Sequence, residues 1–116
     1  RISDDTRALD ELADSLSEAD SGGRLKLASQ KFYFAGLVAC IENLCLSPHG
    51  VSSIERSVRM RDMLEAPRTR QMVAALKDNH RGLGLLFGPI ASAMPARCVM
   101  CTHLAAFLNR TGSKTA

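Results

Sequence analysis

Two cysteines and a histidine stand close together in the stretch ARCVMCTHLAAFLNR, near the carboxyl end of the sequence. Cys98 and Cys101 are three residues apart, and His103 follows two residues later. Thiolates and imidazoles are the ligands that structural zinc prefers, and four of them must converge on the ion. The stretch therefore raises the hypothesis of half a zinc site, for which Cys40 and Cys45 are the remaining candidate ligands.

An apolar helix explains the same residues better. A helix turns by about 100° per residue, so Cys98 and Cys101 share one side while His103 points roughly 140° or more away from both. The apolar face that contains Cys101 also contains Leu104, Ala105 and Leu108. Free cysteine packs as a small apolar side chain. We therefore expect all four cysteines to pack in the core, with a zinc site and then a disulfide as the less favoured alternatives, and we expect no cofactor.

A catalytic cysteine–histidine pair is another interpretation of these residue types. A nucleophilic cysteine needs a lowered pKa in a partly exposed, electropositive site. The cysteines fall on apolar faces, whereas His49 and His80 fall in expected turns. The sequence also lacks the GxSxG, HExxH, P-loop and GxGxxG motifs. We therefore expect no enzymatic activity.

An arginine-rich segment is the strongest remaining signal. Residues 56–81 contain seven basic side chains and only three acidic ones. Arginine binds phosphate and carboxylate groups in bidentate fashion, so such a surface suits an anionic partner. No aromatic residue falls among the arginines, so RNA or DNA would be held by phosphate contacts rather than by base stacking. The candidate residues for an anionic partner are Arg56, Arg59, Arg68, Arg70, Lys77 and Arg81.

Two expected helices would position these basic residues. The spacing predicts that Ile54 and Val58 begin the apolar face of one helix and that Arg56 and Arg59 lie opposite them. Arg70 and Lys77 are expected on the exposed side of the next helix. Two neighbouring helices would then present one arginine-rich surface. The alternative is an ordinary solvated face with local ion pairs.

The first 20 residues carry the opposite charge. They contain seven acidic and two basic side chains, a net charge of −5, while the other 96 residues contain 13 basic and five acidic ones, a net charge of +8. The anionic partner is therefore nucleic acid, an acidic protein segment or the chain's own N-terminal arm. A helix expected over residues 4–20 has a narrow apolar stripe, typical of an arm on a surface or a dimer seam. The candidate self-association residues are Leu9, Leu12 and Leu16.

The elements that must position these groups are all helices. No stretch alternates strictly between polar and apolar residues, as a half-buried strand would. The sequence predicts an all-α fold, a compact bundle of five to six helices around a central apolar helix at about residues 30–46. We expect a single domain, with residues 1–20 as an acidic helix or arm and residues 24–110 as the core bundle.

Several residues mark the expected helix boundaries. Ser52 with Glu55 three residues later forms a capping box. Pro67 ends or kinks the helix that begins there. A short helix is expected over residues 89–93, and the Thr111–Gly112 pair is expected to end the last helix.

Composition limits the function classes. Hydrophobic residues make up 46% and charged residues 23% of the 116-residue chain, which is typical of soluble globular proteins. No apolar run reaches the roughly 18 residues of a membrane span, so we expect no membrane partner. The sequence starts at Arg1 without a methionine, which suggests a fragment of a longer protein.

Together these features predict a non-enzymatic interaction or oligomerisation domain of a larger regulatory protein. Its partner is expected to be an anionic or helical protein segment, or a second copy in a homodimer. The alternative is an RNA- or DNA-binding domain that uses the arginine-rich face. An intracellular location, cytoplasmic or nuclear, is expected because nothing in the sequence indicates secretion.

Overall fold

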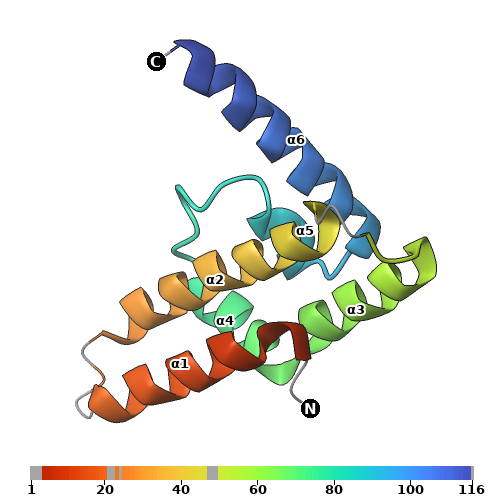
Figure 1. Cartoon of the computed structure of the whole chain (residues 1–116). Coiled ribbons are helices and arrows are strands. Elements are labelled where there is room, and N and C mark those ends of the chain that lie inside the picture. The colour runs from red at the N-terminus through yellow and green to blue at the C-terminus, as the bar shows by residue number, and fades with distance from the viewer. Residues whose placement is uncertain (1–3, 21–22, 24, 47–49, 116) are drawn as a thin grey trace.

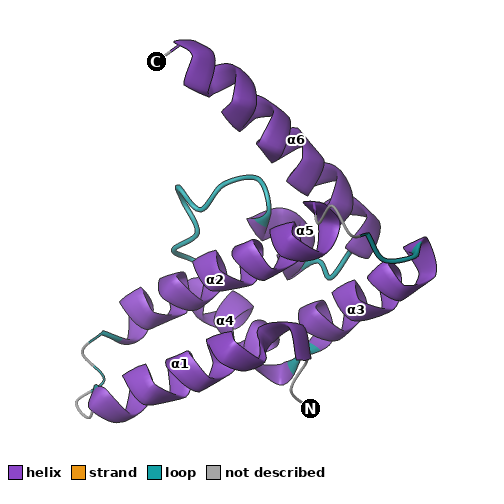
Figure 2. Ribbon diagram, viewed as in Figure 1, coloured by secondary structure: helices purple, strands orange, loops and turns teal. Residues whose placement is uncertain are grey.

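The computed structural model describes residues 4–20, 23, 25–46 and 50–115, with side chains described through residue 110. These residues form helices and connecting turns, and they contain no strand (Figure 2). The elements are a 3-10 turn, η1 (Asp4–Thr6), and six α-helices: α1 (Arg7–Ala19), α2 (Lys26–Leu46), α3 (Ser53–Glu65), α4 (Pro67–Leu76), α5 (Phe87–Ala91) and α6 (Pro95–Thr115). The predicted all-α bundle with a central apolar helix is confirmed.

The central helix, α2, packs against α1, α3, α4 and α6. Its buried side chains recur at steps of three or four residues, as the sequence pattern predicts for one wide apolar face. The fully buried side chains of the core are aliphatic or sulfur-containing: Leu37, Ile41, Met60, Met63, Leu64, Met72, Leu76, Ile90 and Cys98. Because the core contains few aromatic rings, flexible methionines fill much of the space between the helices.

The long last helix leaves the bundle. The first part of α6 packs against α2, α3 and α5, and the rest projects beyond them (Figure 1). The radius of gyration is 14.6 Å, whereas a fully compact chain of this length would have about 13.4 Å. No helix among the described residues combines the length and apolar content that a membrane crossing requires.

Two of the predicted boundaries are confirmed. The hydroxyl of Ser52 accepts a 3.1 Å hydrogen bond from the backbone N–H of Glu55 and so caps the start of α3. Pro67 is the first residue of α4 and separates it from α3. Proline suits that position, because the first helical N–H has no partner within the helix.

The end of the last helix is a correction. α6 continues through Gly112 to Thr115, because one glycine within a helix costs only about 1 kcal/mol relative to alanine and does not force it to stop. The short α5 helix likewise begins at Phe87 rather than at the proline two residues later.

The orientation of α3 is a second correction. Ile54 is 80% exposed and Val58 is 49% exposed, whereas Met60, Met63 and Leu64 are fully buried. These two sets of apolar residues lie on roughly opposite sides of the helix, so only one can face the core. The larger set faces it, and the side predicted to be buried faces outward.

Candidate functional site

The acidic N-terminal segment lies along the core of its own chain, with α1 beside α2 (Figure 1). The Asp10 carboxylate is only 6% exposed and accepts hydrogen bonds from the Tyr33 hydroxyl at 2.7 Å and the Thr6 hydroxyl at 3.2 Å. Burial and the bond to Asp10 raise the pKa of Tyr33 well above its usual value. The phenol therefore stays protonated and serves as a permanent donor to Asp10.

Ion pairs extend this contact on both sides of Asp10. Arg59 of α3 donates from Nε to Asp5 at 3.1 Å and makes a second bond to the same carboxylate. Arg68 of α4 pairs with Asp14 and donates to the backbone carbonyl of Asp10 at 3.0 Å. Two arginines predicted to bind an anionic partner thus bind the chain's own arm, which was one of the three anionic partners considered.

Arg70 is not on the exposed side of α4, which corrects the sequence-based expectation. Its guanidinium donates to the carbonyl of Leu64 at 2.9 Å, to the carbonyl of Ala91 at 2.9 Å and to the carbonyl of Ile90. These carbonyls belong to the last turns of α3 and α5, where a helix offers its carbonyls few partners. The carbonyl of Ile90 also accepts a 3.1 Å hydrogen bond from the backbone N–H of Ala93. Arg70 therefore joins two helix ends with one side chain.

The other three candidate basic residues differ in accessibility. Arg56 is half-buried, while Lys77 and Arg81 are exposed. The exposed turn between them contains His80, whose ring stacks on Phe87 with centroids 4.7 Å apart. The basic residues therefore do not form the predicted single surface. Arg59 and Arg68 bind the N-terminal segment, Arg70 binds the ends of two helices, and Lys77 and Arg81 are exposed.

The three leucines of α1 have two different environments. Leu9 packs against the core at Gly36, where an added Cβ would overlap its side chain. Leu12 and Leu16 remain 48% and 37% exposed. The lack of a side chain at Gly36 allows α1 to approach α2 closely. Leu16 lies seven residues from Leu9 and so on nearly the same side of α1, and the exposed parts of Leu12 and Leu16 border the side that packs on the core.

The cysteines pack as small apolar residues, as predicted. Cys98 is fully buried, and Cys40, Cys45 and Cys101 are half-buried against the core. All four are free thiols. Within the described part of the chain, no three His, Cys, Asp or Glu side chains are grouped as metal ligands, and His49 lies outside the described residues.

Burial controls the reactivity of these thiols. Loss of hydration raises the pKa of Cys98 from 9.0 to about 12, so its reactive thiolate is scarce at pH 8. We expect Cys98 to resist iodoacetamide in the native protein and to react in concentrated urea, as measured by mass spectrometry of its peptide. Equal rates in both conditions would contradict its burial.

The same shift predicts a loss of stability in alkali. The pKa of Cys98 is higher in the folded protein than the ordinary value of 9.0, so folding favours the protonated thiol. This contribution is fully present below about pH 9 and is lost as the pH rises toward 12. Denaturant midpoints should fall over that range, and a Cys98→Ala variant should show a smaller fall.

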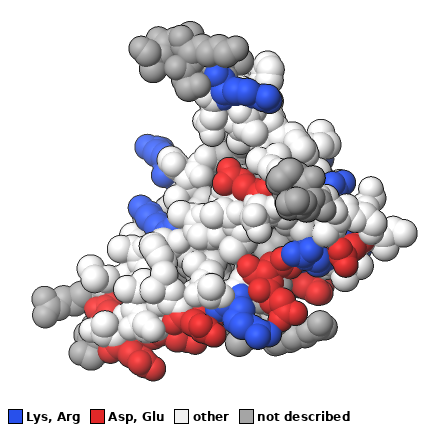
Figure 3. All heavy atoms as spheres, viewed as in Figure 1, with Lys and Arg blue, Asp and Glu red and all other residues white. Residues whose placement is uncertain are grey.

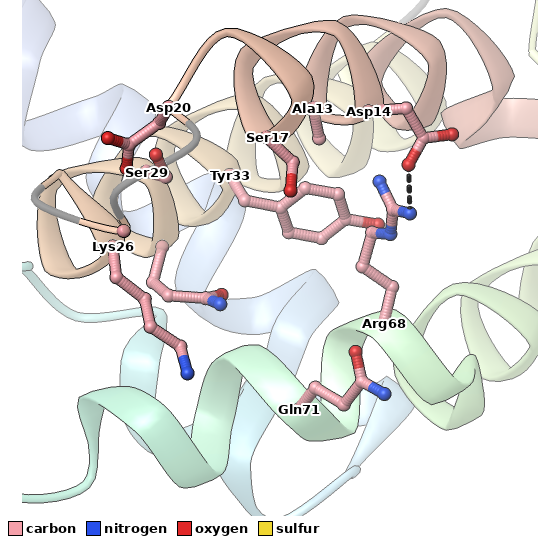
Figure 4. A pocket seen from close by; sticks show the side chains of 11 residues that line it. Ala13, Asp14, Ser17, Asp20, Lys26, Ser29, Tyr33, Arg68 and Gln71 are labelled. Carbon is pink, nitrogen blue, oxygen red and sulfur yellow. Dashed lines mark hydrogen bonds and ion pairs between the residues drawn. The ribbon is translucent and has the colours of Figure 1, made fainter.

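A pocket of about 270 Å³ lies where α1 and α2 join, facing α4. In Figure 4, the side chains of Lys26 and Gln71 point into the space between α2 and α4, and Arg68 lies beside the Tyr33 ring and contacts Asp14. Among the described residues, no buried side-chain nitrogen or oxygen lacks a hydrogen-bond partner. The pocket is open, and no buried polar side-chain atom of the described residues is left to bind a ligand, so it identifies no ligand class.

An exposed apolar stripe on α6 was missed by the sequence reading, which placed Leu104 and Leu108 on the buried face. The helix buries Cys98 and Thr102 instead. The opposite side carries four large exposed apolar side chains, with exposed fractions of 69%, 48%, 54% and 50% for Met100, Leu104, Phe107 and Leu108. We call these four residues the α6 stripe. They recur at helical spacing and share one side of α6.

The charge on α6 is uniformly basic. Residues 95–115 contain two arginines, one lysine and one histidine, and no aspartate or glutamate. Arg97 and Arg110, near the two ends of the α6 stripe, are both exposed. In Figure 3, a basic patch lies on the projecting part of α6, whereas acidic side chains gather along α1 at the opposite edge of this face. The α6 stripe is thus an apolar surface between cations.

Comparisons with protein families, with curated proteins and with solved structures find no match to this chain.

Proposed function

We propose that this chain is a non-enzymatic helical interaction domain of a larger regulatory protein, and that the α6 stripe binds an acidic, amphipathic partner helix. The α6 stripe is the observation that carries the proposal. A helix that is apolar on all sides is normally covered on all sides, whereas the described residues bury α6 on the side of Cys98 and Thr102 and leave Met100, Leu104, Phe107 and Leu108 exposed. Exposed apolar side chains at three- and four-residue steps are the anchors by which helices bind one another.

The charge of α6 supports an acidic partner. Arg97 and Arg110 lie near the two ends of the α6 stripe, and the helix has no carboxylate to oppose them. These cations attract a partner that has acidic residues beside its apolar side, and they fix how the two helices align. A basic partner is repelled. Covering the exposed halves of four large side chains contributes on the order of 1 kcal/mol each, which suits reversible association.

Phosphate binding by the arginine-rich segment has less support. Arg59 and Arg68 already bind carboxylates of the N-terminal segment, and Arg70 binds backbone carbonyls. A nucleic acid would have to displace the N-terminal segment to reach the first two arginines. The free cysteines suit a reducing compartment, so the proposal includes an intracellular location, cytoplasmic or nuclear.

A synthetic helical peptide tests the proposal. The probe is about 20 residues long, with leucines at i, i+3, i+4 and i+7 and glutamates beside them. We expect micromolar binding by fluorescence anisotropy, and at least a tenfold weaker affinity for Leu104→Ser with Phe107→Ser, because two central anchors are lost.

A matched variant and a second peptide serve as controls. Ile54→Ser with Val58→Ser removes two exposed apolar side chains from α3 and should leave the affinity unchanged. A peptide with lysines in place of the glutamates should bind more weakly. Equal loss in the α3 variant, or equal binding of the lysine peptide, would contradict the proposed site.

A further inference from the structure

The surface of α1 suggests which acidic helix binds the α6 stripe. Resting on the proposed function, we propose that the partner is α1 of a second copy of this chain, so that the protein self-associates through α1–α6 contacts. The inference follows from the exposed apolar side chains of α1, the charges that flank them and the length over which they run.

α1 has exposed apolar side chains beside the side that its own core covers. Leu9 and Asp10 contact the core. Leu12 and Leu16, together with the exposed Ala8 and Ala19, form a stripe that borders this covered side, because Leu16 lies seven residues from Leu9. We call these four residues the α1 stripe. A leucine stripe of this kind is one half of a helix–helix seam, and it needs a second apolar helix face to be covered.

The charges beside the α1 stripe are complementary to those of α6. Glu11 and Glu18 are exposed and seven residues apart, so they lie on the same side of α1. On α6, the exposed charges near the ends of the stripe are those of Arg97 and Arg110. Pairing α1 with α6 places acidic side chains near basic ones, whereas pairing α1 with α1, or α6 with α6, brings like charges together.

The α1 stripe is also long enough to cover the α6 stripe. It runs 11 steps from Ala8 to Ala19, about 16.5 Å, whereas the α6 stripe runs eight steps from Met100 to Leu108, about 12 Å, at 1.5 Å per residue. In antiparallel order, Glu11 lies toward Arg110 and Glu18 toward Arg97. The pairing therefore covers the α6 stripe along its whole length.

The docking of α1 on its own core holds the α1 stripe in a fixed orientation before a second copy binds. Asp10 is held by Tyr33, and Asp5 and Asp14 are held by Arg59 and Arg68. These bonds fix α1 with Leu12 and Leu16 exposed, so little conformational entropy is lost when a second copy binds. Two copies related by a two-fold axis make the α1–α6 contact twice.

Charge reversal in the full chain tests the inference. One variant carries Glu11→Arg and Glu18→Arg, and another carries Arg97→Glu and Arg110→Glu. We expect the wild-type chain to self-associate in sedimentation equilibrium with a dissociation constant on the order of 10–100 μM. Each variant alone should associate at least tenfold more weakly, because its α1 and α6 then carry like charges.

Mixing the two variants is the decisive experiment. The basic α1 of one then meets the acidic α6 of the other, and the remaining α1–α6 pair keeps its natural charges, so the equimolar mixture should associate as the wild type does. The control, Lys31→Glu with Arg61→Glu, reverses two exposed cations on α2 and α3 and should leave self-association unchanged. Thermal melts of every variant check that α1 stays docked.

Three results would overturn the inference: a wild-type chain that stays monomeric at millimolar concentration, variants that associate as well as the wild type, or a mixture that does not recover. Binding of the acidic peptide to α6 with no self-association would leave the proposed function standing and assign the α6 stripe to another protein's helix. Loss of both would reject the two proposals together.

Discussion

Replacing Arg70 with alanine is expected to lower the free energy of unfolding by about 3 kcal/mol. The guanidinium donates to carbonyls of Leu64, Ile90 and Ala91, at the ends of α3 and α5. Without it, those carbonyls lose a charged donor where each helix also has the negative end of its dipole. Urea unfolding followed by circular dichroism measures the change.

The position of Arg70 also predicts how close substitutions behave. Arg70→Lys should recover only part of the loss, because one ammonium group cannot reproduce the planar fork that spans two helix ends. Lys77→Ala, at an exposed position one residue beyond α4, should change stability by less than about 0.5 kcal/mol. If Arg70→Ala were as mild as Lys77→Ala, the helix-end contacts would be energetically unimportant.

Replacing Tyr33 with phenylalanine is expected to lower the free energy of unfolding by about 2 kcal/mol. The ring still fills its buried site, but the 2.7 Å bond to Asp10 disappears. A carboxylate that is only 6% exposed then keeps the weaker 3.2 Å bond from Thr6. Urea unfolding at neutral pH measures the loss.

A double-mutant cycle separates this bond from general packing effects. Asp10→Ala alone leaves the Tyr33 hydroxyl without its acceptor. The double variant, with Tyr33→Phe and Asp10→Ala together, should therefore cost less than the sum of the two single changes, by about 1 kcal/mol or more. Strictly additive losses would show that the two side chains do not stabilise each other.

Local patterns in the sequence predicted much of the fold. The capping serine at residue 52, the proline at residue 67 and the apolar spacing of α2 each act through neighbouring residues, so a sequence pattern is enough to identify them. The packing of the cysteines follows for the same reason, because their helical spacing places them beside other apolar residues.

Other features depend on tertiary contacts. Both sides of α3 carry apolar residues, so helical spacing alone could not decide between Ile54 and Met60 as the buried side. The same ambiguity concealed the exposed α6 stripe. The sequence of α6 did contain a signal of the α6 stripe. Its apolar residues are distributed around the whole helix, so one buried face cannot hold all of them.

The arginines show why charge counts are incomplete evidence for a binding surface. Seven basic residues in one segment predicted an acidic contact, and the acidic N-terminal arm was among the expected partners. The sequence did not reveal that Arg70 turns back toward the ends of α3 and α5. That contact depends on the angle between α4 and its neighbours, which no local pattern encodes.

The placement of α1 also determines the order in which the chain can gain its native contacts. Asp10 and Tyr33 are 23 residues apart, whereas the pairs Asp5–Arg59 and Asp14–Arg68 are each separated by 54 residues. Closing a longer loop costs more chain entropy. We therefore expect the contact between α1 and α2 to form before α1 contacts α3 and α4. When α3 and α4 pack later, Asp5 and Asp14 are already in place on η1 and α1. Arg59 and Arg68 then neutralise these two carboxylates, which have no arginine partner in the α1–α2 hairpin.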